Sequence, residues 1–124
     1  MFKVNDDLSI YVTRSDAAVI RLIAANGNER YTFAAGDVVR INVFKKKDCH
    51  SVVLQKDFPV TEDAQEAEII LTSEDTKIGK IISKPEDYWY EIELNPETTP
   101  QTIIGYDENG PKVFRLFPEG GELE

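Results

Sequence analysis

The chain has few of the residue types that a reactive site or a disulfide-stabilised fold requires. Its 124 residues include one cysteine, one histidine and one tryptophan. One cysteine cannot form an internal disulfide, so the fold must depend on a hydrophobic core, for which a single domain of this length suffices. A structural zinc site takes about four Cys or His ligands, and the chain has only Cys49 and His50. We therefore expect no metal site, and we interpret Asp48, Cys49 and His50 as a turn.

Long apolar runs and basic stretches are also scarce. No apolar run approaches the roughly 18 residues of a membrane span, and the N-terminus lacks the apolar segment of a secretory signal. The net charge is −9: residues 1–60 carry nine basic and seven acidic residues, and residues 61–124 carry five and sixteen. Because duplex binding needs a basic surface, we predict neither nucleic-acid binding nor membrane insertion. We interpret the basic run 45–47 as a solvated loop. The uneven charge would suit head-to-tail contacts between copies, and a merely solubilising acidic surface is the alternative.

What is present is a series of short β-type segments. Turn residues recur about every ten positions, between segments rich in Val, Ile, Tyr and Phe, which is typical of a β-sandwich or barrel. We expect strands at 9–13, 17–24, 30–33, 38–45, 51–56 with an extension to 60, 66–71, 88–94, 101–106 and 112–117, the last two as a hairpin. One capped helical turn is expected near 72–78, where Thr72 and Asp75 can exchange hydrogen bonds. The sequence predicts an all-β, immunoglobulin-like antiparallel β-sandwich of seven to nine strands over residues 1–118, followed by a flexible acidic tail at 119–124.

The only tryptophan lies on the charged face of its strand. Strand side chains alternate with period two, so residues 88, 90, 92 and 94 share one face, and Trp89, Glu91 and Glu93 share the other. Trp89 is either a contact residue, since tryptophan is enriched at binding interfaces, or a ring covered by a neighbouring loop. Together with Val113 and Phe117, if they share that outer face, it is predicted to form an association patch.

The carboxylates give no comparable sign of chemistry. Glu91 and Glu93 lie about 7 Å apart along one strand, and glycosidases do use two carboxylates, but solvated strand glutamates are far commoner. No phosphate-binding glycine loop and no serine nucleophile elbow occur in the sequence. We predict a protein that is not an enzyme and that has no cofactor.

Several short motifs carry a family resemblance that spans nearly the whole chain. They are Phe2-x-Val4 followed by Asp6-Asp7, Thr13-Arg14-Ser15-Asp16, Tyr31-Thr32-Phe33 with Gly36-Asp37, residues 70–76 (Ile-Leu-Thr-Ser-Glu-Asp-Thr), Tyr88-x-Tyr90-Glu91-Ile92, Thr102-Ile103-Ile104, and Phe114-x-Leu116 near Pro118. In these the chain resembles small proteins of Firmicutes phages and prophages, and it is similar to the N-terminal immunoglobulin-like domain of baseplate upper proteins. Two departures stand out. Ser15 occupies a position where glycine is expected, which implies a different turn geometry, and the chain comprises one domain, where the larger baseplate proteins continue.

The resemblance implies an assembly role without catalytic residues. We expect a virion structural protein of the tail or baseplate that contacts other virion proteins and further copies of itself. It would reside in the host cytoplasm during assembly and then in the virion. The alternative is a ligand-binding module, most plausibly for carbohydrate, in which Trp89 and Tyr106 would stack on sugar rings.

Overall fold

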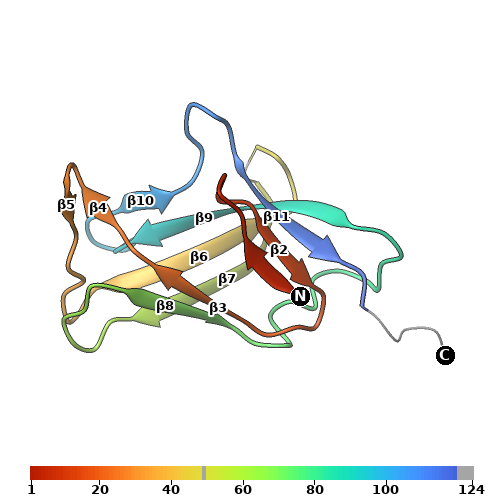
Figure 1. The fold of residues 1–124 in the computed structure, drawn as a ribbon, viewed down its shortest axis with the longest axis horizontal. Coiled ribbons are helices and arrows are strands. Elements are labelled where there is room, and N and C mark those ends of the chain that lie inside the picture. The colour runs from red at the N-terminus through yellow and green to blue at the C-terminus, as the bar shows by residue number, and fades with distance from the viewer. Residues whose placement is uncertain (49, 120–124) are drawn as a thin grey trace.

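The computed structural model describes residues 1–48 and 50–119, and the secondary structure of that part of the chain is entirely β (Figure 1). Its eleven strands are β1 (Phe2–Val4), β2 (Ile10–Thr13), β3 (Ala18–Leu22), β4 (Ala25–Asn26), β5 (Glu29–Arg30), β6 (Val38–Phe44), β7 (Val52–Pro59), β8 (Ala67–Leu71), β9 (Glu86–Leu94), β10 (Gln101–Ile104) and β11 (Lys112–Phe117). The all-β prediction is confirmed. The strand count exceeds seven to nine because β1 and β4 were not expected, and β5 covers only the start of the strand expected at 30–33.

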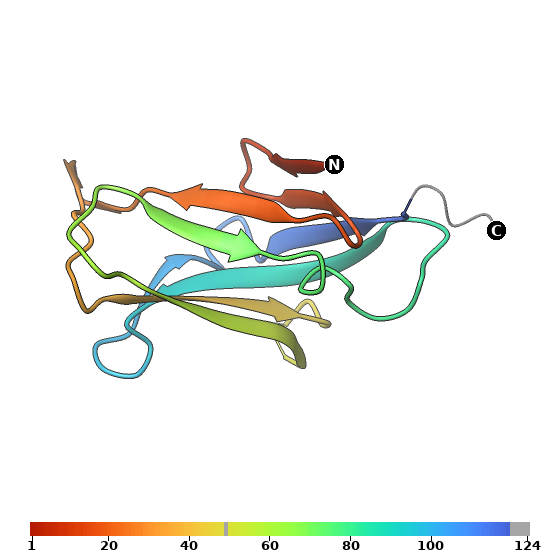
Figure 2. The ribbon, with the colours of Figure 1, turned by 90° about the horizontal axis from the view of Figure 1, so that it is seen from below.

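The strands form one large sheet and two small ones. The large sheet has the order β1-β2-β11-β9-β6-β7, with β10 also paired to β9, while β3 pairs with β8 and β4 with β5. Figure 2 shows the β3–β8 pair lying over one face of the large sheet. β2 and β11 run parallel, so the expectation of a wholly antiparallel fold is wrong. The β1–β2 hairpin brings β2 beside β11 in the same direction.

The core fills the space between these two layers, as the period-two alternation predicts. On β6 the side chains of Val39, Ile41 and Val43 are fully buried. On β9 the inward residues are Tyr88, Tyr90, Ile92 and Leu94, all 7% exposed or less. On β3 and β11 the same alternation buries Ile20 and Phe114. Burial at this spacing fixes the register of each strand, since a slip of one residue would expose the whole apolar set.

Two local expectations are wrong, the first because the segment is too short and the second because pairing at a distance overrides a local pattern. Residues 73–76 form a hydrogen-bonded turn and not a helix, although Thr72 and Asp75 do exchange the expected bonds at 2.8 and 3.2 Å. One turn without a packed apolar face is too short to persist as a helix. The strands β10 and β11 do not form a hairpin with each other. Both pair with β9, β10 near Leu94 and β11 near Tyr90, one after the other along the same edge.

The turn after β2 keeps a glycine-like conformation although it lacks glycine. Ser15 has a φ of 76°, in the left-handed region that favours glycine. A left-handed serine is less favourable there than a glycine would be. Arg14, its neighbour, is buried and donates to the carbonyl oxygens of Ile78 at 3.3 Å and Gly79 at 3.0 Å, and to Glu119 at 2.6 Å. Residues 120–124, most of the expected tail, lie outside the described residues.

Candidate interaction surface

The outer face of the large sheet, turned away from β3 and β8, carries an apolar row across three strands. Trp89 on β9 pairs in register with Val113 on β11 and with Phe44 on β6. Paired residues project from the same face of a sheet, so the three side chains are neighbours. Phe44 is 5% exposed, and Trp89 and Val113 are half-buried. Trp89 thus lies between Val113 and Phe44 in this row, and part of its side chain is exposed to solvent.

A second aromatic pair extends this row toward β2. Phe117 lies four residues beyond Val113, on the same face of β11, and its ring centroid is 5.3 Å from that of Tyr11. Arg115 lies between Val113 and Phe117. It binds Asp87 at 2.6 and 3.2 Å, and its guanidinium lies 5.2 Å from the Tyr11 ring centroid. We call the set Trp89, Val113, Phe44, Phe117 and Tyr11 the aromatic patch. It includes all three residues predicted from the sequence.

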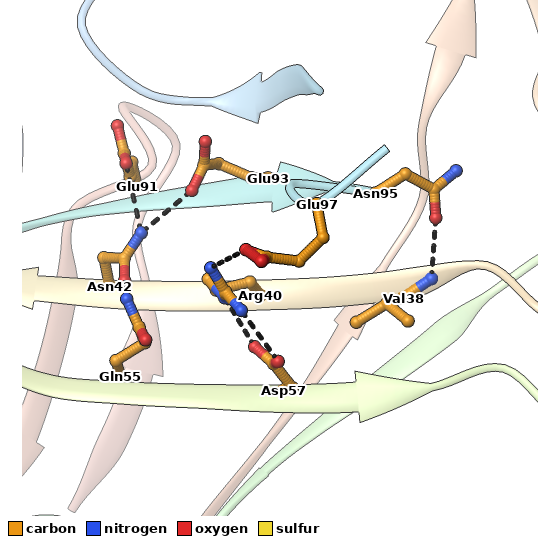
Figure 3. A network of polar contacts seen from close by, with 9 residues as sticks. All are labelled: Val38, Arg40, Asn42, Gln55, Asp57, Glu91, Glu93, Asn95 and Glu97. Carbon is orange, nitrogen blue, oxygen red and sulfur yellow. Dashed lines mark hydrogen bonds and ion pairs between the residues drawn. The ribbon is translucent and has the colours of Figure 1, made fainter. Parts of the chain in front are cut away.

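Beyond the aromatic patch the same face becomes polar (Figure 3). Gln55 on β7 donates to the Asn42 side-chain oxygen at 2.8 Å, and the Asn42 amide donates to Glu91 at 3.1 Å and to Glu93 at 3.0 Å. Next to them, Arg40 binds Asp57 at 2.6 and 3.0 Å and Glu97 at 3.3 Å. Asn42 lies on the outer face, but it is only 5% exposed because its neighbours cover it.

Glu91 and Glu93, which both accept a hydrogen bond from the Asn42 amide, make one end of this face acidic. Burial, and secondarily the charge of Glu93, raises the pKa of the Glu91 carboxyl, although the bond from Asn42 opposes the shift. No described lysine or arginine forms an ion pair with either glutamate. Two half-buried carboxylates beside an apolar surface are suited to receive a cationic side chain from another molecule.

The opposite end of the same face is basic. β6 ends at Phe44, and the backbone N–H groups of Lys45 and Lys46 donate to the carbonyl oxygens of Ser51 and His50, so the lysine run lies in a hydrogen-bonded turn between β6 and β7. Lys45 also lines a depression with Lys80, Lys84 and Glu86. Residues 45–47 are exposed. From one end to the other, the outer face thus runs from lysines through the aromatic patch to carboxylates.

The remaining predicted residues lie elsewhere. His50 is exposed in the β6–β7 turn and donates its backbone N–H to Asp48 at 3.2 Å, and Cys49 lies outside the described residues. Tyr106, the second predicted sugar-stacking residue, is 69% exposed in the loop between β10 and β11. Within residues 1–48 and 50–119 no three His, Asp or Glu side chains gather as a metal site would require. The same residues contain no helix long and apolar enough to cross a membrane.

Comparison of the chain with models of known protein families, with curated proteins and with solved structures found no match.

Sequence reasoning missed Phe44 and Tyr11 in the aromatic patch. Alternation along β6 does place Phe44 on the face of Arg40 and Asn42, which is a usable signal. What it cannot supply is the register of β6 against β9, which sets Phe44 beside Trp89 and not beside Glu91.

Proposed function

We propose that this chain is a non-enzymatic structural protein of a phage or prophage-derived particle, in its tail or baseplate, and that it assembles through the aromatic patch. The observation that carries the proposal is the row formed by Trp89, Val113 and Phe44 on the outer face. Folding does not require large apolar side chains on the solvent side of a sheet, and tryptophan in such a place is typical of contact surfaces.

The order of the strands supports an immunoglobulin-like relationship. In variable-type immunoglobulin domains, strands G, F, C and C′ lie side by side in one sheet, and B and E lie in the other. Here β11, β9, β6 and β7 have that order, and β3 pairs with β8. The inter-sheet disulfide of antibody domains has no counterpart in a chain with one cysteine. We propose the relationship on strand order and on the resemblance in sequence.

Particles purified from a lysogen that carries the gene test this function. We expect the chain to copurify with the particles, and Trp89→Ala and Val113→Ala to remain in the soluble fraction although they fold. Val19→Ala is the matched control, because Val19 is 46% exposed on the β3–β8 layer, away from the aromatic patch. Particles free of the wild-type chain, or particles that retain all three variants equally, would contradict the proposal.

The exposure of Tyr106 keeps carbohydrate binding as a second candidate function. An exposed aromatic ring can stack on a sugar. A glycan-binding screen separates the two candidates: specific binding that Tyr106→Ala or Trp89→Ala abolishes would favour the ligand-binding function. A screen without binding, together with copurification in particles, favours assembly.

A further inference from the structure

The charges on the outer face are arranged so that the face complements itself. Taking the row of Trp89 as the centre, Asn42, with Glu91 beside it, lies two residues to one side along β6, about 7 Å away at a rise of about 3.3 Å per residue. On the other side the strand ends at Phe44, and the exposed lysine run 45–47 follows it in the turn toward β7. None of the ion pairs among the described residues includes residues 45–47, Glu91 or Glu93.

We propose that the outer face binds the same face of a second copy of this chain, related by a two-fold axis that crosses the strands at Trp89. This inference rests on the proposed function, and it names the partner of the aromatic patch. The rotation reverses the direction of the strands, so that the lysine turn of one copy, with Lys46, lies over Asn42 of the second copy, beside Glu91 and Glu93. The two aromatic patches meet at the centre, and the lysine–carboxylate contact occurs twice, as an isologous interface requires.

In the proposed dimer, lysine side chains supply a counter-charge to the carboxylates of Glu91 and Glu93, which have no ion-pair partner among the described residues of a single copy. The Asn42 amide already holds Glu91 and Glu93 in place through bonds of 3.1 and 3.0 Å, so an incoming ammonium group would find two oriented acceptors. Gln55 fixes the amide in turn, at 2.8 Å. A preorganised charged site lowers the cost of binding. The net charge of −9 opposes association at long range, so the contact depends on this local arrangement of opposite charges.

Charge reversal tests the arrangement, with analytical ultracentrifugation as the readout. We expect the wild-type chain to form a dimer, and Lys46→Glu and Glu93→Lys each to be monomeric, because each variant places like charges together at both contacts. An equimolar mixture of the two variants should again form a dimer, since both contacts then join opposite charges. Lys77→Glu is the control. It changes the net charge as Lys46→Glu does, but it lies after β8, where Lys77 pairs with Glu74 at 3.2 Å.

Three results would overturn the inference: a wild-type chain that stays monomeric at its solubility limit, a dimer that Lys46→Glu leaves intact, or a mixture that stays monomeric. Circular dichroism and a melting curve for each variant establish that it is folded. A monomeric wild-type chain that still enters particles through Trp89 would remove the second copy as partner and leave the proposed function standing. A dimer that behaves as expected, in a chain absent from particles, would do the reverse.

Discussion

Replacement of Arg14, the residue that directly follows β2, should lower the stability of the fold strongly. Its side chain is buried, and its guanidinium joins three segments that are distant in sequence: the end of β2, the loop at residues 78–79, and Glu119 after β11. Replacement by methionine keeps much of the apolar stem but leaves the carbonyl groups of Ile78 and Gly79 without a donor.

The size of the loss follows from those two bonds. A hydrogen bond to a charged group contributes about 1.5–3 kcal/mol, and the bond to Ile78 is long at 3.3 Å. We expect Arg14→Met to lower the free energy of unfolding by about 3 kcal/mol, a large part of the 5–15 kcal/mol typical of a domain. Arg14→Lys should lose about half as much, since one ammonium group cannot reproduce the planar fork of donors.

Urea denaturation followed by circular dichroism measures this difference. With a slope of about 1.5 kcal/mol per M, the Arg14→Met midpoint should fall by about 2 M. Arg21→Met is the control, because Arg21 is exposed on β3 and surface substitutions usually change stability by less than about 0.5 kcal/mol. A loss at Arg14 no larger than that at Arg21 would refute the role given to the guanidinium.

Three further substitutions test the core, the strained turn and the buried carboxylate. Phe114→Ala should cost about 3–5 kcal/mol in urea denaturation, because Phe114 is fully buried; a loss below 1 kcal/mol would contradict its place in the core. Ser15→Gly should raise stability by about 0.5–1 kcal/mol, since relief of left-handed strain exceeds the added chain entropy, whereas Ser15→Ala should not; equal effects would exclude strain as the cause. Burial raises the pKa of the Glu91 carboxyl above its usual 4.5, so the folded state binds this proton more tightly than the unfolded state does. The bound proton stabilises the fold fully below pH 4.5, and this stabilisation is lost as the pH rises through the raised pKa. Glu91→Gln should therefore be more stable than the wild type at neutral pH and should converge with it below pH 4.5; an unchanged difference across that range would contradict the burial of Glu91.

Local alternation predicted the strands that carry the core, and it did so best where one face is fully apolar. The inward sets on β6, β9 and β11 follow directly from period two, and the bounds of β11 were predicted to the residue. Alternation also identified Trp89, because an indole among glutamates has no purpose in the core. Val113 and Phe117 follow from the same rule once Phe114 and Leu116 are placed inward.

Features that depend on pairing at a distance could not be predicted this way. The turn residues 107–111 are typical of a hairpin, yet β10 and β11 both pair with β9. The parallel pairing of β2 with β11 leaves no local signal. Alternation places Asn42 on the outer face but gives only the direction of its side chain, whereas its burial comes from Gln55 and the two glutamates on neighbouring strands.

The emission maximum of Trp89, recorded together with molecular mass during dilution, tests most directly the claim that the aromatic patch is the contact surface. Trp89 is the only tryptophan, so the signal reports this patch alone. The account predicts that the emission shifts to the red as the mass falls from dimer to monomer, with one midpoint for both. An emission maximum that stays constant while the mass halves would place the contact elsewhere on the molecule, and a mass that is that of the monomer at every concentration would remove the second copy altogether.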